Sequence, residues 1–259
     1  MTALLIIFVF IFGTIIGSFL NVAALRYNSG RTIGGRSSCF SCRHVLSWYE
    51  LIPVLSFLST MGKCRSCKSR ISWQYPIVEC VTGLLFVALA LKIGFDFTAA
   101  AADIFAAVMF SILMVITVYD YRHKIIPDGL VYSFSIIALL QIFLIGPITT
   151  DALLAGPILF LPFFLLWWLS RGKWIGLGDG KLALGIGWAL GLIDGVGAII
   201  LGFWIGAAVS LTLLAFKPKG LTIKSEIPFG PFLVLGFILM YFFRWDILGL
   251  HVISFLIND

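Results

Sequence analysis

Two aspartates stand at the edges of apolar segments in a chain that has only 12 acidic residues. Asp179 lies in the run Gly176-Leu177-Gly178-Asp179-Gly180-Lys181, directly before an apolar segment, and Asp120 directly follows the apolar residues 115–119. A carboxylate at the edge of hydrocarbon must be paired, protonated or reached by water. If folding brings the two carboxylates together in a poorly solvated cleft, they do not both ionise easily, so one keeps a proton while the other activates water. That is aspartyl hydrolase chemistry: bound water attacks a peptide carbonyl, and the protonated carboxyl group donates to the developing oxyanion.

Four of the five cysteines form two C-x-x-C pairs, Cys39 with Cys42 and Cys64 with Cys67. Four thiolates at this spacing suit a tetrahedral structural zinc site in which each pair supplies two ligands from one turn. Disulfides or a redox pair are the alternatives, and a reducing cytoplasm disfavours them. A segment of about fifty residues buries little core, so a metal would supply much of its folding free energy. We expect Cys80, in an apolar segment, to be a packed core thiol.

The composition identifies an integral membrane protein, since 61% of the residues are hydrophobic and the mean hydropathy is +1.08. A transmembrane helix needs about 20 apolar residues to cross roughly 30 Å of hydrocarbon. The sequence therefore predicts an all-α polytopic membrane protein with about eight transmembrane helices. Their expected positions are residues 3–25, 76–91, 97–119, 129–145, 152–169, 182–193, 195–216 and 228–243.

Three of the apolar segments need comment. The first lacks a basic start and a convincing cleavage site, so we expect a retained helix and not a removed signal peptide. The sixth, at 182–193, is short, so Asp179 in front of it is expected to be recessed. Residues 247–257 either extend the last helix or lie along the membrane interface.

Basic residues lie almost entirely on one predicted face of the bundle. With eight spans, all but Lys92 and Arg244 of the 18 basic residues fall on the same side. Because Lys and Arg accumulate in cytoplasmic loops, this side is placed in the cytoplasm, and Asp120 and Asp179 lie on it. The formal net charge of +6 is then explained by topology and by anionic membrane lipid, and no nucleic-acid partner is expected.

The sequence predicts three parts: a first transmembrane helix at residues 1–25, a cytoplasmic zinc-binding loop domain at 26–74, and a transmembrane domain with both aspartates at 75–259. Within the loop domain, residues 46–58 are apolar but too short to cross a bilayer. A crossing there would also separate the two cysteine pairs. We expect this segment to lie in the membrane interface, where Trp and Tyr are favoured.

Other polar residues near the aspartates have structural explanations. Asp128 follows Pro127 and is expected to cap the next helix. For Asp120, an ion pair with Arg122 or Lys124 is the alternative to catalysis. His123 is expected to be a loop residue, and the closely spaced glycines of the later helices are expected to let helices pack. These glycines are Gly185, Gly187, Gly191, Gly195, Gly202 and Gly206.

Short motifs recur in a fixed order along the chain, and together they are specific. They are Gly17-Ser18-Phe19-Leu20-Asn21-Val22 with Arg26, Trp48-Tyr49-Glu50-Leu51-Ile52-Pro53, Gly62-Lys63-Cys64-Arg65 with Cys67, Ile71-Ser72, Tyr75-Pro76 with Val78-Glu79, Asp120 with Ile126-Pro127-Asp128, Gly176 with Gly178-Asp179 and Lys181, and Ile227-Pro228-Phe229-Gly230-Pro231-Phe232. Over nearly its whole length the chain resembles the type IV prepilin peptidases, membrane aspartyl proteases of the GxGD kind.

The resemblance implies a bacterial inner-membrane enzyme that cuts basic leaders from type IV prepilins, or from the pseudopilins of type II secretion, on the cytoplasmic side. It implies that Asp120 and Asp179 are the catalytic pair. Members with the cysteine loop commonly also methylate the new N-terminal residue with S-adenosylmethionine. Many relatives carry another acid where this chain has Arg122, which indicates that this acid is dispensable, and Tyr27-Asn28 replaces a proline often found after the first helix.

The residues that would bind S-adenosylmethionine are not identified by any motif. No G-x-G-x-x-G follows a strand, so a site would have to be built from the cytoplasmic loop and the adjoining helix ends. Glu79, an acid early in the second span, is a candidate contact, and a structural pairing is the alternative.

A proton-coupled transporter is the rival function, because it too embeds acids in the membrane. It would distribute acids through the membrane depth. Here Asp103, Asp151 and Asp194 are expected near the outer ends of the helices, and Asp120 and Asp179 at the inner ends. This arrangement favours the hydrolase.

Overall fold

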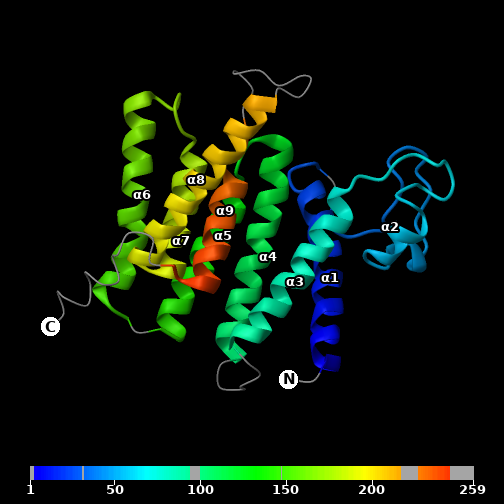
Figure 1. The fold of residues 1–259 in the computed structure, drawn as a ribbon, viewed down its shortest axis with the longest axis horizontal. Coiled ribbons are helices and arrows are strands. Elements are labelled where there is room, and N and C mark those ends of the chain that lie inside the picture. The colour runs from blue at the N-terminus through cyan, green and yellow to red at the C-terminus, as the bar shows by residue number, and fades with distance from the viewer. Residues whose placement is uncertain (1–2, 31, 94–99, 147, 217–226, 246–259) are drawn as a thin grey trace. The chain divides into compact units, whose positions relative to one another are not determined.

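A computed structural model describes residues 3–30, 32–93, 100–146, 148–216 and 227–245. Within these ranges the chain is helical and has no strand. Along the chain the elements are α1 (Ala3–Arg26), η1 (Trp48–Leu51), α2 (Leu55–Ser59), α3 (Gln74–Ile93), α4 (Ala100–His123), α5 (Asp128–Leu144), α6 (Thr150–Ser170), α7 (Leu177–Leu190), α8 (Leu192–Phe216) and α9 (Gly230–Phe243) (Figure 1). The predicted all-helical membrane fold is confirmed.

The apolar helices differ in length. Five helices are long and apolar enough to cross a bilayer, namely α1, α3, α4, α6 and α8, while α5 and α9 are shorter apolar helices. A helix lies at each of the eight predicted positions. Because only five of these helices are long enough by themselves to cross a bilayer, the count of eight stays a prediction. Residues 247–257 lie outside the described residues.

The chain divides into two compact units, Met1–Val115 and Ile116–Asp259. In the first unit α1 packs along α3, and small residues allow the contact. A Cβ added to Gly13 would lie 2.8 Å from the Cα of Gly83, which leaves no room for a side chain. Residues 27–73, here called the cysteine lobe, lie between the end of α1 and the start of α3 (Figure 1).

Residues 46–58 of the cysteine lobe form η1 and the five-residue helix α2. Neither is long enough to cross a membrane, so the prediction that this segment does not span is confirmed. Their hydrophobic side chains are largely exposed, with Trp48 and Leu55 among them. The interfacial position of the segment stays a prediction.

In the second unit α7 packs against α5, α6 and α8, and α8 packs against α9. The expectation that glycines let the helices pack is confirmed for all of the named glycines except Gly191, where an added Cβ would meet no atom within 4 Å. A Cβ on Gly187 would lie 2.6 Å from the carbonyl oxygen of Ala155 in α6, and one on Gly202 would lie 3.1 Å from that of Phe232 in α9. α7 is thereby enclosed by its neighbours.

The predicted bounds of the sixth span, 182–193, were wrong at both ends. α7 begins at Leu177, so it includes Asp179 in its first turn, and it ends at Leu190. Gly191 has φ of +83°, a conformation that glycine adopts at little cost, and it separates α7 from α8. The expected shortness is confirmed, because α7 has 14 residues.

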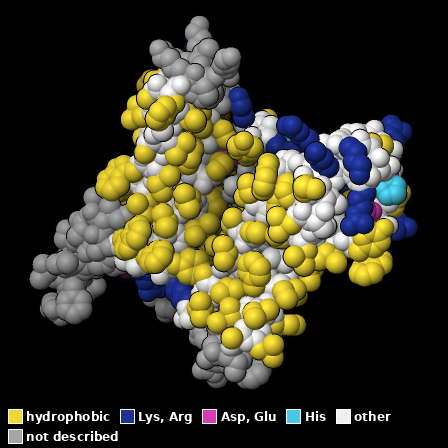
Figure 2. Space-filling view, turned by 45° about the vertical axis from the view of Figure 1, so that its right-hand side comes forward, with side chains coloured by type: hydrophobic (Ala, Val, Ile, Leu, Met, Phe, Trp, Pro, Cys, Tyr) yellow, Lys and Arg dark blue, Asp and Glu magenta, His cyan; other side chains and the backbone are white. Residues whose placement is uncertain are grey.

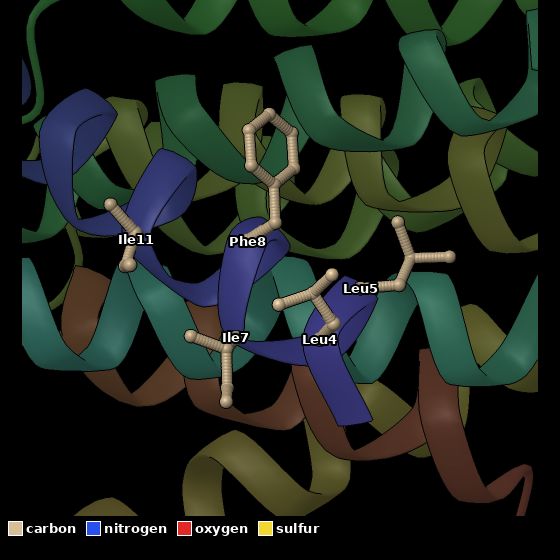
Figure 3. A pocket seen from close by; sticks show the side chains of 5 residues that line it. All are labelled: Leu4, Leu5, Ile7, Phe8 and Ile11. Carbon is tan, nitrogen blue, oxygen red and sulfur yellow. The ribbon is translucent and has the colours of Figure 1, made fainter. Parts of the chain in front are cut away.

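The outer surface is that of a membrane protein. Hydrophobic side chains cover the helices in Figure 2, and lysine and arginine side chains gather over the cysteine lobe. On α1 a hollow is lined by Leu4, Leu5, Ile7, Phe8 and Ile11 (Figure 3). All of these lining side chains are hydrophobic, so the hollow suits lipid acyl chains and offers no side-chain group for catalysis.

Asp194, one of the acids predicted at the outer ends, is buried at the start of α8. Its Oδ2 lies 3.7 Å from Nε of Arg244, the residue that ends α9. This ion pair gives Asp194 a structural role, so its burial is explained without the proton relay of a transporter.

Candidate active site and cysteine cluster

Asp120 lies near the C-terminal end of α4 and is buried. Its Oδ2 accepts a hydrogen bond of 2.9 Å from the amide of Gly230, at the start of α9 and 110 residues away in sequence. The helix ends just after Asp120, since Lys124 has φ of +55° and its amide donates to the Asp120 carbonyl at 2.7 Å. The carboxylate is therefore fixed by backbone, which meets its need for a partner without Arg122 or Lys124.

Asp179 lies in the first turn of α7, whose N-cap is Gly176. The side chain turns back toward that cap: a Cβ on Gly176 would lie 3.2 Å from Oδ2 of Asp179. The positive end of the helix dipole favours a carboxylate here. Asp179 is partly exposed. The structure thus brings both predicted acids into one unit, with Asp120 buried and Asp179 within reach of solvent.

Ile126 packs between the start of α7, which carries Asp179, and the start of α9, whose Gly230 amide holds Asp120. A Cβ on Gly178 would lie 3.0 Å from Cβ of Ile126, and a Cβ on Gly230 would lie 3.2 Å from its Cδ1. Larger residues at these two glycines would push the segments apart. The glycines therefore matter because they allow the start of α7 and the start of α9 to close on the end of α4.

Asp128 does not cap α5, so that prediction was wrong. The N-cap is Pro127, and Asp128 is the first residue of the helix. Its Oδ1 instead lies 2.7 Å from Nζ of Lys181 in α7, and that ammonium group is 5.2 Å from the ring centroid of Tyr132. The pair joins the starts of α5 and α7, two residues beyond Asp179, and so holds the turn that presents this acid.

Gly230 offers a direct test of how Asp120 is held. In a Gly230→Ala variant the new Cβ would lie 2.6 Å from Oδ2 of Asp120, so the backbone must move and the hydrogen bond from the residue 230 amide to Asp120 is lost. We expect peptide hydrolysis to fall roughly 10- to 100-fold, as for loss of one hydrogen bond to a charged group. The control is Gly34→Ala, where a Cβ meets no atom within 4 Å. Equal rates for the two variants would show that this bond does not position Asp120.

The four predicted cysteine ligands come together in the cysteine lobe. The Sγ atoms of Cys39, Cys42, Cys64 and Cys67 all lie within 4.8 Å of one another. Cys39 and Cys67 are 3.8 Å apart, and Cys42 and Cys64 are 4.0 Å apart. A tetrahedral zinc ion with Zn–S bonds of about 2.3 Å places its sulfurs roughly 3.8 Å apart, so the thiols fit zinc.

The two cysteine pairs have the same backbone frame. In the first, the Cys39 amide donates to the His44 carbonyl, and Arg43 has φ of +59°. In the second, the Cys64 amide donates to the Ser69 carbonyl, and Lys68 also has φ of +59°. Each pair is thus a tight turn that points two sulfurs the same way, as the C-x-x-C spacing predicts.

The thiols differ in acidity. A hydrogen bond from the Cys42 amide favours the Cys39 thiolate and lowers the pKa of Cys39 to about 6. The His44 amide likewise favours the Cys42 thiolate, but desolvation and the neighbouring thiols outweigh it and raise the pKa of Cys42 to about 11. At neutral pH without a cation, Cys39 is therefore mostly a thiolate while Cys42 keeps its proton, and a divalent ion would displace that proton.

Glu50 links the two cysteine pairs, and sequence reasoning did not assign it this role. Its side chain is buried and accepts a hydrogen bond of 2.9 Å from the Ser47 amide. His44, after the first pair, lies 3.7 Å from Oε2, and Arg65, within the second, lies 4.0 Å from Oε1. Its place in the Trp48–Pro53 motif was the available signal.

Glu79, the candidate cofactor contact, is buried in α3. Its Oε2 accepts a hydrogen bond of 2.7 Å from the amide of Val54 in the cysteine lobe. The structural pairing that the sequence left open is therefore present. Cys80 is free and partly buried in α3, apart from the cluster of four.

Comparison with known proteins identifies the family to which this chain belongs. Residues 11–93 match the model of the bacterial Peptidase A24 N-terminal domain, and residues 107–211 match that of the type IV leader peptidase family. A prepilin leader peptidase/N-methyltransferase of Bacillus subtilis (strain 168) is 35% identical over 252 residues, covering 94% of this chain and 96% of that protein. The chain belongs to the type IV leader peptidase family.

Other proteins with the same name have similar sequence identity to this chain. That of Myxococcus xanthus (strain DK1622) is 33% identical over 214 residues, or 80% of this chain and 63% of the relative. That of Aeromonas hydrophila is 30% identical over 258 residues, or 88% and 87%. No solved structure matches the chain. The match to the leader peptidase model contains Asp120 and Asp179, and the N-terminal match contains the four cysteines.

Proposed function

We propose that this leader peptidase is an aspartyl endopeptidase that uses Asp120 and Asp179 to remove the basic leader of type IV prepilins or of type II secretion pseudopilins. The observation that carries the proposal is that the start of α7, with the partly exposed Asp179, and the start of α9, whose Gly230 amide holds the buried Asp120, pack on the same residue, Ile126. Relatives across the family bear the name prepilin leader peptidase. An apolar bundle with such a pair supports proteolysis at a membrane surface.

The reaction needs one shared proton between the two carboxyl groups. The ionised carboxylate takes a proton from bound water as the water oxygen attacks the scissile carbonyl, and the protonated carboxyl group donates to the oxyanion. When the tetrahedral intermediate collapses, the carboxyl group that took the water proton donates it to the leaving nitrogen, and the other carboxylate takes a proton from the hydroxyl group that becomes the new carbonyl. No acyl-enzyme forms, and Gly230 and Gly176 hold the carboxylates in place throughout.

The enzyme is placed in the bacterial inner membrane, where its apolar helices belong. We assign the cysteine lobe and the two aspartates to the cytoplasmic face, because the basic residues of the lobe follow the positive-inside rule. That face is also where a prepilin presents its leader. Membrane lipid is then a partner of the helices, and nucleic acid is not.

The second activity is methylation of the new N-terminal residue with S-adenosylmethionine as methyl donor. It is supported by the N-methyltransferase part of the relatives' names and by the separate N-terminal family match at residues 11–93. The four cysteines would hold zinc as a structural ion, since their sulfurs already have tetrahedral spacing. Zinc there would fix the lobe and take no part in bond breaking.

Mass spectrometry of a prepilin co-expressed with the enzyme tests both activities at once. We expect the pilin to lose its leader at one bond and to gain one methyl group at the new N-terminus. A pilin co-expressed without the enzyme is the control. Unchanged prepilin in the presence of folded enzyme would contradict the proposed peptidase, and a cleaved pilin without the methyl group would contradict the methyltransferase alone.

A further inference from the structure

Glu79 is a buried acid that the peptidase chemistry does not use. Its hydrogen bond to the Val54 amide, at 2.7 Å, joins α3 to the segment between η1 and α2 in the middle of the cysteine lobe. α1 lies close by, because a Cβ on Gly17 would be 2.9 Å from the Cα of Glu79. The carboxylate therefore sits where the lobe meets the α1–α3 pair.

Val54 has an unfavourable backbone conformation. Its φ is 62° and its ψ is −52°, values that a β-branched residue rarely adopts. Strained residues of this kind persist only where surrounding contacts enforce them, and they cluster at functional sites. The bond from Glu79 reaches the amide of this same residue, and the Leu58 amide donates to its carbonyl at 3.0 Å, so Glu79 is the contact from outside the turn that holds Val54 in this conformation.

The turn at Val54 controls how the rest of the lobe packs. The chain enters α2 directly after it, and this brings Phe57 into the interior, with its ring centroid 4.9 Å from that of Trp73. Gly62 lies against the same ring, since a Cβ there would be 2.8 Å from Cζ of Phe57. Cys64 follows two residues later. The packing that follows the Val54 turn, through Phe57 and Gly62, therefore leads directly to the second cysteine pair.

We propose that Glu79 is a positioning residue that holds Val54 in its strained turn and thereby fixes the cysteine lobe on the α1–α3 pair, and that N-methylation requires the lobe in this place. The second half rests on the proposed methyltransferase function. The first half does not. Because an amide side chain also accepts a hydrogen bond, the role needs an acceptor at residue 79 and not a negative charge.

Three variants separate this role from others. Glu79→Leu removes the acceptor, Glu79→Gln keeps one, and Glu79→Leu combined with Val54→Gly removes the acceptor together with the strain, because glycine adopts positive φ at little cost. The matched control combines Glu79→Leu with Leu58→Gly, a glycine placed at an exposed position of α2 that has no strain to relieve. Hydrogen exchange at the Val54 amide, leader cleavage and N-methylation are measured for each.

In Glu79→Leu we expect the Val54 amide to exchange at least about tenfold faster and methylation to fall about tenfold or more, with cleavage unchanged. Glu79→Gln should stay within about threefold of the wild type in all three measurements. Val54→Gly should restore methylation to Glu79→Leu, and Leu58→Gly should not. Retained cleavage also shows that the variants are folded.

Four results would overturn the inference. They are unchanged Val54 exchange in Glu79→Leu, equal loss of methylation in Glu79→Gln and Glu79→Leu, no rescue by Val54→Gly, and loss of cleavage together with methylation. Equal loss with intact Val54 protection and a raised KM for S-adenosylmethionine would assign Glu79 to cofactor binding instead. Failure of the proposed function is distinguishable, because it appears as absent methylation in the wild type while Val54 stays protected.

Discussion

Asp120→Asn and Asp179→Asn each abolish leader cleavage while the protein stays folded; this is the largest effect that we expect. A carboxamide can neither hold the shared proton nor accept one from water, and general acid–base catalysis by such a group contributes about 10²- to 10⁴-fold to the rate. The rate of prepilin cleavage by purified enzyme in detergent is the measurement. Both single variants should be equally inactive, since each removes one half of the pair.

Asp151→Asn is the matched control, because Asp151 is an exposed acid in the first turn of α6. It should cleave at the wild-type rate. Thermal unfolding of all three variants reports whether the fold is kept. Full cleavage by either Asp120→Asn or Asp179→Asn would remove that residue from the mechanism. A solute flux lost in Asp179→Asn, with cleavage kept, would instead revive the transporter.

The second large effect concerns the cysteines. Purified protein should contain about one zinc per chain, and Cys39→Ser combined with Cys64→Ser should remove it, since each pair then keeps a single sulfur. Structural zinc contributes about 10–16 kcal/mol to the folding of small peptides, so the lobe should lose protection from proteases. Metal analysis and limited proteolysis measure the two consequences.

Cys80→Ser is the control for the cysteine experiment, because Cys80 lies outside the cluster of four. It should keep the zinc. Leader cleavage should continue in the double variant, since Asp120 and Asp179 belong to the other compact unit, while methylation is lost. A wild-type protein that is folded and free of metal would refute the zinc site.

Local patterns in the sequence were sufficient for the parts of the site whose chemistry is carried by residue type and short spacing. The cysteine pairs were found because each is one turn, and Asp120 and Asp179 because an acid beside hydrocarbon is conspicuous. The contact between Gly230 and Asp120 could not be found in this way. It joins residues 110 apart and depends on how α9 packs near the end of α4.

The partners of Asp128 and Glu79 were not predicted for the same reason, because they too come from segments that are distant in sequence. An Asp after a proline is locally a good cap, but Lys181 from another helix competes for its carboxylate and is 2.7 Å away. Glu79 gave no local sign that its partner is an amide of the cysteine lobe, because nothing in the sequence around Val54 predicts a positive φ. The spacing of Gly191 from the other glycines predicted a role in helix packing. The backbone conformation in the structure shows instead that Gly191 is the C-cap that ends α7.

The clustering of the four cysteine sulfurs has a consequence for the unfolded state of the lobe. A metal held by both cysteine pairs is a cross-link that closes the loop from Cys42 to Cys64, and Val54 lies near the middle of that loop. Closing a loop of this length restricts the unfolded chain by about 3 kcal/mol. The ion would therefore lower the entropic cost of ordering the segment that contains the Val54 turn, and metal and Glu79 would both stabilise the same segment of the lobe.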